Sequence, residues 1–182
     1  MTALKKLAKY LGEYFKFITY NKSEFIPLSA ELKHAQMYAA IQEIRFQNRI
    51  SCRFELAGIV DSWEVPRLIV QPILENAFIH GLEYKETGGS IVVAVEAEDR
   101  QLNIRIKDNG IGIDPKQLER WQAGIALSSR KEDATKDGIH GLENVHKRLK
   151  LLYGSGSGIC LANNELGGVT AMITIDRTGE GE

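Results

Sequence analysis

QPILENAFIHG, residues 71–81, is a run of apolar residues with polar side chains at one-turn spacing. With Pro66 as the first helical residue and Gly81 as the stop, the pattern predicts a helix that reaches about His80. Asn76 and His80 are four residues apart and therefore share one face of this helix. A buried Asn needs a polar partner. That partner is either a core residue or a ligand, and this stretch alone leaves both interpretations open.

A second motif, Asp108-Asn109-Gly110-Ile111-Gly112-Ile113, directly follows a run with strand character. An Asp at the end of a strand places a carboxylate at the edge of the sheet, and the two glycines let the backbone approach a ligand. Such a carboxylate can accept a hydrogen bond from the exocyclic amine of adenine. A tight Asn-Gly turn without a ligand explains the same residues equally well.

A third motif, Gly138-Ile139-His140-Gly141-Leu142, opens a predicted helix over 139–152. Glycines at the start of a helix expose backbone N–H groups, which form a site for anions such as phosphate. The Gly-Lys-Ser/Thr ending of a Walker A loop is missing, and no strand immediately precedes the motif as in a dinucleotide fold. A simple capping turn remains the alternative.

The order of the predicted elements indicates an α+β protein. Two helices come first, and strands with helices and turns between them follow. The fold expected is a two-layer α/β sandwich whose mixed, mostly antiparallel sheet is covered by helices on one face and preceded by two helices. The predicted helices cover 2–20, 29–47, 66–80 and 139–152, with Ser29 as an N-cap; the strands lie at 50–56, 91–95, 102–106, 159–161 and 169–175; a polar loop with a short helix near its start covers 114–137.

Composition excludes several classes of function. The 182 residues carry 23 Lys and Arg against 24 Asp and Glu, so net charge gives no case for binding nucleic acid or an anionic membrane. Cys52 and Cys160 are far apart and form no Cys-x-x-Cys pair, which predicts two small core residues in a reducing compartment. Lysines interrupt the apolar residues of 1–20, and no run is long enough to span a bilayer, so we expect a soluble chain.

Taken together, the three motifs resemble the ATP-binding domains of the GHKL superfamily, which share the Bergerat fold. ENAFIHG around Asn76 is similar to the N box, and DNGIGI at 108–113 and GIHGLENVHKRL at 138–149 are similar to the two glycine boxes. QPILENAFIHG and the segment FIPLSAELKHAQMYAAIQEIRFQNRI at 25–50 most resemble sensor histidine kinases of the LytS and YesM type.

This resemblance implies the catalytic ATP-binding domain of a two-component sensor histidine kinase. Such a domain transfers the γ-phosphoryl group of ATP to a His, from which it passes to a response regulator. The alternatives are a GHKL module that binds nucleotide without chemistry and a GHKL ATPase.

The resemblance also implies a role for individual residues. Asn76 coordinates a Mg²⁺ ion that bridges the ATP phosphates, and Asp108 accepts a hydrogen bond from the adenine amine. Gly110 and Gly112 make room for the base, and residues 114–137 form a lid over ATP. The remaining residues expected to bind ATP are His80, Ile113, Gly138, His140, Gly141, Leu142 and Thr170, with Asn144 and Arg148 as weaker candidates.

Two positions depart from the family pattern. Pro72 stands where GHKL enzymes that hydrolyse ATP have a Glu base, and Glu75 points about 100° away from Asn76 around a helix, so activation of water is disfavoured. Ile79 stands where many histidine kinases have a Lys. His80, or Arg130 or Lys131 of the lid, is expected to supply that charge.

The chain lacks an acceptor His in a PHFLFN-like context. Its four histidines are 34, 80, 140 and 146, and we expect His34 to be solvated or interfacial. The sequence is therefore expected to be a piece of a longer bacterial protein, inactive without its acceptor segment. We expect 1–48 to be the end of a dimerisation and phosphoacceptor region, 49–176 the ATP-binding domain and 177–182 a disordered tail. The full-length protein is expected to be a homodimeric integral membrane protein with this domain in the cytoplasm, a response regulator as partner, and no nucleic acid partner.

Overall fold

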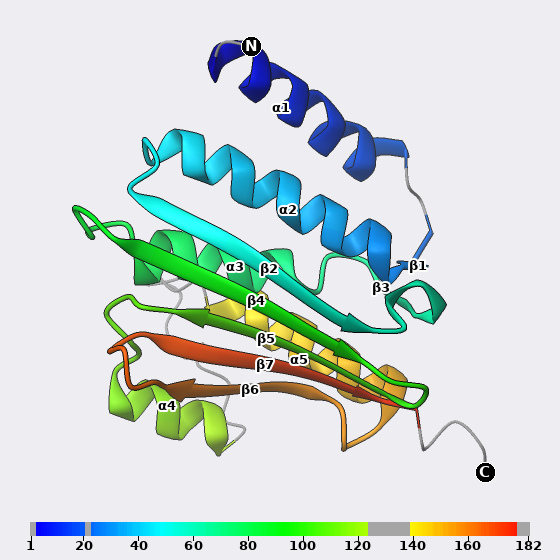
Figure 1. Ribbon diagram of the computed structural model, residues 1–182. Coiled ribbons are helices and arrows are strands. Elements are labelled where there is room, and N and C mark those ends of the chain that lie inside the picture. The colour runs from blue at the N-terminus through cyan, green and yellow to red at the C-terminus, as the bar shows by residue number, and fades with distance from the viewer. Residues whose placement is uncertain (1–2, 21–22, 124–138, 178–182) are drawn as a thin grey trace.

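The computed structural model of the chain describes residues 3–20, 23–123 and 139–177 (Figure 1). Helices and strands follow one another much as the periodicity predicts. The helices are α1 (Ala3–Tyr20), α2 (Leu28–Arg45), a 3₁₀ turn (Val60–Ser62), α3 (Gln71–Glu75) with a π-helix (Asn76–Gly81), α4 (Pro115–Gln122) and α5 (Ile139–Tyr153). The strands are β1 (Phe25–Pro27), β2 (Ile50–Gly58), β3 (Glu64–Pro66), β4 (Gly89–Ala97), β5 (Gln101–Asp108), β6 (Gly158–Asn163) and β7 (Val169–Asp176).

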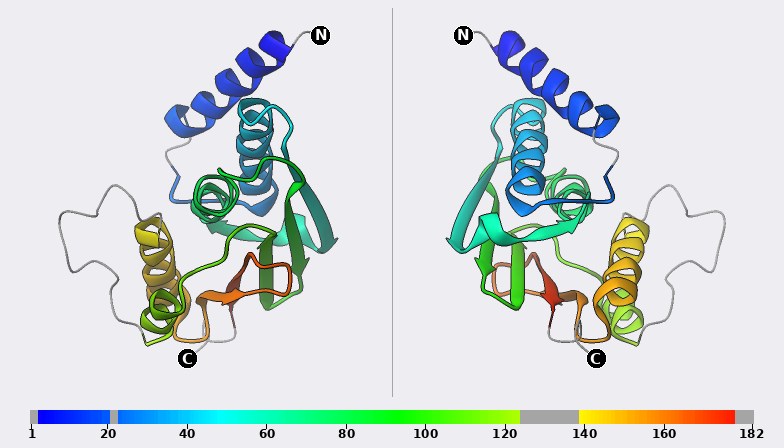
Figure 2. Two further views of the ribbon diagram at one scale, coloured as in Figure 1. Left: turned by 90° about the vertical axis from the view of Figure 1, so that its left-hand side faces the viewer. Right: turned by 90° about the vertical axis from the view of Figure 1, so that its right-hand side faces the viewer.

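The main sheet has five strands in the order β2-β4-β5-β7-β6. Strand β2 runs parallel to β4, and every other neighbouring pair is antiparallel. Figure 2 shows α2, α3 and α5 on one face of this sheet. The predicted two-layer α/β sandwich with a mixed, mostly antiparallel sheet is confirmed. The short β1–β3 pair, which the sequence did not reveal, forms a second, two-stranded sheet.

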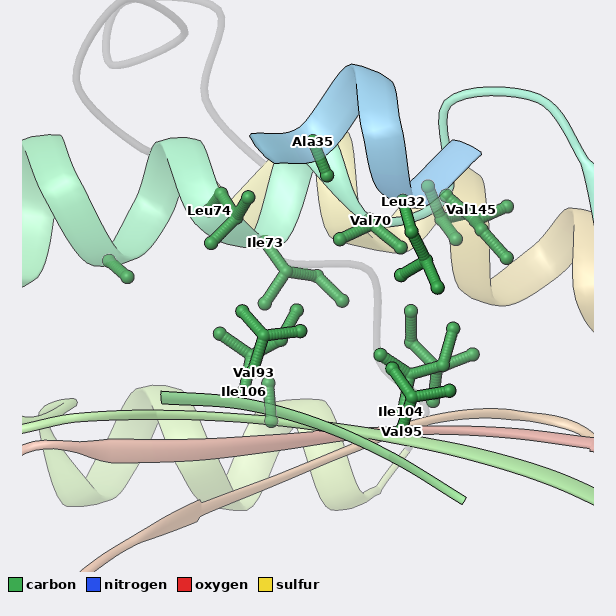
Figure 3. Close-up of a cluster of buried hydrophobic side chains, with 14 of the residues drawn as sticks. Leu32, Ala35, Val70, Ile73, Leu74, Val93, Val95, Ile104, Ile106 and Val145 are labelled. Atoms are coloured by element: carbon green, nitrogen blue, oxygen red, sulfur yellow. The ribbon is translucent and has the colours of Figure 1, made fainter. Parts of the chain in front are cut away.

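Alternation along the central strands builds the core. Val93 and Val95 of β4 and Ile104 and Ile106 of β5 are at most 2% exposed. In Figure 3 these side chains point at the helix layer. Full burial of one such aliphatic side chain contributes roughly 1.5–3 kcal/mol. The side chains that meet them from the helix layer are Leu32, Ala35, Ile73, Leu74 and Val145 of the helices and Val70 just before α3.

Helix α2 is part of this core. Leu28, Leu32 and Ala35 are at most 2% exposed and belong to the same apolar cluster as the strand residues. The helix begins at Leu28 after Pro27 and has no side-chain cap, so the predicted Ser29 cap is wrong. A domain boundary between 48 and 49 stays a prediction, since α2 and the sheet share one cluster.

The predicted helix over 66–80 is wrong at its start. Pro66 ends β3, and α3 begins only at Gln71. Leu68 has a φ of 59°, which a helix cannot contain. The backbone N–H groups before α3 donate instead to the Glu31 carboxylate on α2, a tertiary contact that a local pattern does not reveal.

His34 lies between α1 and α2. It is fully buried, and its ring stacks on Tyr14 at 4.7 Å and on Phe17 at 4.1 Å between ring centroids. Neither ring nitrogen has a hydrogen-bond partner in the described part of the chain. Of the two expected environments, the structure selects the interfacial one. Neither α1 nor any other described helix has the length and apolar character needed to cross a membrane.

The two cysteines lie in different surroundings. Cys52 on β2 is half-buried, and burial raises the pKa of its thiol to about 12. Cys160 is exposed, because it points away from the helix layer on edge strand β6. The prediction of two core residues is therefore wrong for Cys160.

The predicted tail lies mostly outside the described residues, which end at Arg177. The Arg177 guanidinium lies 3.8 Å from the centroid of the Trp63 ring, and its backbone N–H donates to the Arg100 carbonyl. Arg177 is thus held against the domain, and the expected disorder can apply only to residues beyond it.

Burial of a neutral His34 predicts acid sensitivity. Burial lowers the His34 pKa from 6.5 to about 4. Between these pH values the unfolded chain binds a proton that the folded chain does not, so stability falls as pH drops from about 6.5 to about 4. His34→Phe keeps the aromatic stack and removes two unpartnered nitrogens, and it should raise the free energy of unfolding by about 1–3 kcal/mol. Denaturation followed by circular dichroism at pH 4.5, 5.5 and 7.0 measures both effects.

The comparison uses the difference between the two proteins, because carboxylates titrate in both. The advantage of the Phe variant should grow as pH falls from 7.0 to 4.5. An advantage that stays constant over this range would show that His34 is not the titrating group.

Candidate functional site

A pocket of about 190 Å³ opens between the π-helix, the end of β5 and the start of α5. It is largely apolar, with Ile73, Ala77 and Leu161 among its walls, and a few polar groups converge on it. Six residues that the sequence predicted for ATP line this pocket: Asn76, His80, Asp108, Gly112, Ile113 and Leu142.

Asp108 is the buried carboxylate of the pocket, at 4% exposed. Its Oδ1 accepts hydrogen bonds from the backbone N–H groups of Gly110 at 2.8 Å and Val169 at 3.3 Å. Burial raises the Asp108 pKa, against the opposing effect of these two bonds and of the Lys85 charge. Oδ2 accepts no hydrogen bond from any described residue, so one oxygen of a buried carboxylate is left for a donor inside the pocket.

Two glycines bring the backbone close to Asp108. A Cβ atom on Gly110 would lie 2.2 Å from the Gly81 carbonyl oxygen, and one on Gly168 would lie 2.4 Å from Asp108 Oδ1. Both distances are far below any tolerated contact, so these positions require glycine. Gly110 was predicted from the motif. Gly168 was missed, and the Gly167-Gly168 pair was its signal in the sequence.

Asn163 and Asn164 fix the glycine motif in place, and the sequence analysis missed both. The Asn163 side chain accepts from the Ile113 N–H at 2.8 Å and donates to the Ile113 carbonyl at 2.9 Å. Asn164 donates to the Asp108 carbonyl at 2.9 Å and accepts from the N–H groups of Leu166 and Gly168. Adjacent Asn residues before a Gly pair indicate a turn, but not that the turn holds the motif.

The π-helix places Asn76 and His80 on the pocket side. A π-helix has more than four residues per turn, so the fourth residue after Asn76 returns to nearly the same face. Ile79 instead packs against the hydrophobic core. The Asn76 Nδ2 is buried in the pocket wall and has no hydrogen-bond partner among the described residues. The site thus contains an amide with an unused end.

The start of α5 borders the same pocket as Asn76. Leu142 lines the pocket, and Gly141 lies so close to α3 that a Cβ atom there would meet the Pro72 Cβ at 3.4 Å. Gly138 is outside the described residues. His140 lies in α5, but its side chain is not described.

The two weaker candidates on α5 do not reach the pocket. Asn144 is exposed, and neither it nor Arg148 is among the lining residues. Arg148 donates from its guanidinium to the Arg67 carbonyl at 2.8 Å, behind the site.

Thr170 is not brought to the pocket. Val169 and Ala171 line it, and the side chain between them lies on the opposite face of β7 because strands alternate. The Thr170 hydroxyl lies 3.4 Å from the Asn164 amide. The residue next to Asp108 is therefore Val169, which contributes its backbone N–H.

The predicted lid is described only at its start. Helix α4 confirms the short helix expected there, and Asp114 caps it by accepting from the Lys116 N–H at 2.9 Å. Gln117 of α4 lines the pocket and was not predicted. Trp121 packs edge-on against His146 of α5 at 5.5 Å between ring centroids. Residues 124–137 of the lid, with Arg130 and Lys131, lie outside the described residues.

The residues of the pocket fit a divalent ion only if a phosphate group supplies further ligands. The described ranges contain no group of three or more His, Cys, Asp or Glu that could hold a metal. Asn76 carries an amide oxygen of the kind that Mg²⁺ accepts, whereas its unpartnered Nδ2 can only donate, to a phosphate oxygen or water. Mg²⁺ in such sites takes most of its other ligands from phosphate and water. The donor set therefore suits Mg²⁺ only together with a phosphate ligand.

Family models match nearly the whole chain. Residues 64–179 match the histidine kinase-, DNA gyrase B- and HSP90-like ATPase family, and residues 2–50 match a histidine kinase family. Sensor histidine kinase YpdA of Escherichia coli is 31% identical over 153 residues, which cover 84% of this chain and 25% of that protein. Sensor protein LytS of Enterococcus faecalis is 30% identical over 172 residues, or 94% of this chain and 28% of that protein. The chain thus spans about a quarter of the length of these relatives.

Solved structures share the fold. The catalytic domain of histidine kinase ThkA has a TM-score of 0.61 at 18% identity, covering 87% of this chain and 97% of that one. ThkA in complex with the response regulator protein TrrA has a TM-score of 0.59 at 16% identity and covers 98% of this chain and 49% of that one. The family matches, together with the pocket and the sandwich fold, show that the chain belongs to the histidine kinase-, DNA gyrase B- and HSP90-like ATPase family, in its sensor histidine kinase branch.

Proposed function

We propose that this chain binds Mg·ATP in the pocket below the π-helix and donates the γ-phosphoryl group to a His that lies outside it. The observation that carries the proposal is Asp108, a buried carboxylate with one oxygen free in an apolar pocket, opposite the unpartnered Asn76 amide. An adenine ring fits this chemistry, because it combines an apolar face with an amine that donates to a carboxylate.

The chain's own groups would act by positioning. Asp108 Oδ2 accepts from the adenine amine, while the apolar walls, including Ile106, Ile113 and Ala171, exclude water from the base. Backbone N–H groups at the start of α5 and the His80 imidazole face the phosphates. Mg²⁺ held by Asn76 and the phosphates would neutralise charge on the transferred group.

Two observations favour a His acceptor over water. Among the described lining residues, Asp108 is the only carboxylate, and it lies at the base end of the site. Glu75 is not in the lining, and its Oε1 accepts from Gln71 Nε2 at 2.7 Å. Pro72 has no base to offer. No described carboxylate is therefore placed to activate water beside the phosphates.

The proposal also covers the two regions of the chain, its oligomeric state, its location and its protein partner. We place residues 1–48 at the end of a dimerisation and acceptor region and 49–176 in the ATP-binding domain. The exposed Leu4, Phe15 and Ile18 on α1 support a surface that a second copy covers in a homodimer. The sensor histidine kinases among the relatives support a cytoplasmic domain of a membrane protein, and the ThkA–TrrA complex supports a response regulator as partner.

A nucleotide-binding module without chemistry is the second candidate. Ile79, in place of the Lys that many histidine kinases have, favours it, because the residue packs into the core and adds no charge at the phosphates. The acceptor experiment below separates the two candidates.

Asp108→Asn tests the base end. Oδ1 is already occupied by two backbone N–H groups, so the new amide nitrogen would face the adenine amine as a second donor. We expect the dissociation constant for ATP, measured by titration calorimetry, to rise about 10- to 100-fold, the loss of a hydrogen bond to a charged group. Wild-type affinity should also fall on acidification as Asp108 protonates, at a higher pH than an ordinary carboxyl because burial raises its pKa.

Asp99→Asn, in the turn at the far end of the same strand pair, is the matched control and should bind ATP like the wild type. Unchanged affinity in the Asp108 variant would show that the adenine lies elsewhere.

Asn76→Ala tests the metal end. Without its amide ligand, the gain in ATP affinity on adding Mg²⁺ should shrink by about tenfold, while affinity in EDTA should stay within about twofold. Asn144→Ala, on the exposed face of α5, controls for loss of an Asn side chain near the site. Equal losses with and without Mg²⁺ would remove Asn76 from the metal site.

An acceptor segment supplied in trans tests the reaction. The chain is mixed with a helical segment that carries the acceptor His of a LytS-type kinase, together with Mg²⁺ and γ-labelled ATP. Labelled phosphate that is acid-labile and base-stable should accumulate on the segment and not in the Asp108→Asn reaction. A chain that binds ATP but labels no acceptor would favour the module, and release of free phosphate without the segment would indicate an ATPase.

A further inference from the structure

Glu31 is a buried charge that the proposed chemistry does not use. It lies in the first turn of α2 and is fully buried. Its carboxylate accepts three backbone hydrogen bonds, from the N–H of Leu68 to Oε2 at 2.9 Å and from those of Ile69 and Val70 to Oε1 at 2.9 and 3.0 Å. A carboxylate in an apolar core is costly unless donors surround it, so these three bonds hold the two segments together.

The three amides lead directly into α3. Val70 is the residue before the first helical residue of α3, and no side chain of its own segment caps this helix. Leu68 adopts a φ of 59°, which turns its N–H toward the same carboxylate as its neighbours. Glu31 therefore fixes, from another element, the backbone that leads into α3, and it places a negative charge near the helix start.

Helix α5 also contacts the segment that Glu31 binds. Arg148 donates to the Arg67 carbonyl just before the three amides, and its charge favours the ionised form of Glu31. About two turns earlier on α5, Gly141 approaches Pro72 of α3 closely. The helices that carry the phosphate end of the pocket thus approach each other at Gly141 and Pro72, and Arg148 ties α5 to the segment that Glu31 holds.

We propose that Glu31 is a positioning residue for the phosphate end of the nucleotide site. By fixing residues 68–70 it sets where α3 begins, and so where Asn76 and His80 lie relative to Gly141 and Leu142 on α5. This rests on the proposed function of the pocket. It also makes α2, from the N-terminal segment, a part of the phosphate site, so that a displacement of α2 moves Asn76 with it.

Glu31→Gln tests the proposal with little change in shape. One amide oxygen can keep the bonds to Ile69 and Val70, but the new NH₂ group would face the Leu68 N–H. We expect the dissociation constant for Mg·ATP to rise about tenfold and that for adenosine to change less than about twofold, because Asp108 and the base end stay in place. A loss of stability alone would weaken both ligands together.

Glu43→Gln is the matched control. Glu43 lies on the same helix and accepts from the Cys52 backbone N–H at 2.6 Å, so its variant removes the same negative charge from a bond that leads into β2 and not into α3. Its ratio of ATP to adenosine affinity should equal that of the wild type. An unchanged ratio in Glu31→Gln, or the same shift in both variants, would overturn the proposal.

Hydrogen exchange gives a readout that needs no nucleotide. Amides of 71–81 should exchange faster in Glu31→Gln than in Glu43→Gln, and equal exchange would overturn the proposal. If the wild type fails to bind Mg·ATP, the proposed function fails, and exchange still decides whether Glu31 fixes α3. Should Glu31→Gln not fold, Glu31→Asp keeps the charge on a shorter stem and is measured in the same two ways.

Discussion

The three hydrogen bonds between the Glu31 carboxylate and the backbone of residues 68–70 are the directional constraint that joins the helices of this layer. It ties α2 to the start of α3, and Arg148 adds α5 through the preceding carbonyl. Apolar packing against β4 and β5 also stabilises this layer, but the hydrophobic effect is non-directional. The directional bonds from Glu31 hold the residues at which α3 begins.

Two buried carboxylates show how similar chemistry serves different ends. Both Glu31 and Asp108 are nearly or fully inaccessible, and burial raises the pKa of each. Glu31 uses both oxygens on backbone N–H groups, whereas Asp108 uses only one. A buried carboxylate such as Glu31, with both oxygens bonded to the backbone, stabilises the fold. One such as Asp108, with an oxygen that has no described donor and lies in a pocket, is available to bind a ligand. Counting donors around a buried acid therefore separates an anchor from a binding group.

Local periodicity predicted most of the fold. The errors arose where contacts between residues far apart in the sequence determine the structure, because a local pattern does not reveal such contacts. Alternation identified the central hairpin, and helical spacing identified α1 and α5. The start of α3 was predicted too early because the carboxylate of Glu31, about 40 positions earlier in the sequence, binds the backbone of the residues that lead into this helix. In the site, motif spacing brought Asn76 and Asp108 to one pocket. Asn163, Asn164 and Gly168 escaped notice because their partners lie across the sheet. Thr170 lies between two residues that line the pocket, so on an alternating strand its side chain is on the other face.

The π-helix also sets which changes in chain length this region can absorb. Because it takes one more residue per hydrogen-bonded turn than an α-helix, Asn76–Gly81 holds one residue in excess of an α-helical path. A single deletion there could be absorbed by a return to α geometry, with Leu82 still seated in the core. In Gln71–Glu75, which is already α-helical, a deletion would rotate the preceding side chains relative to the pocket by about 100°. Natural length variants of this helix should therefore cluster after Asn76.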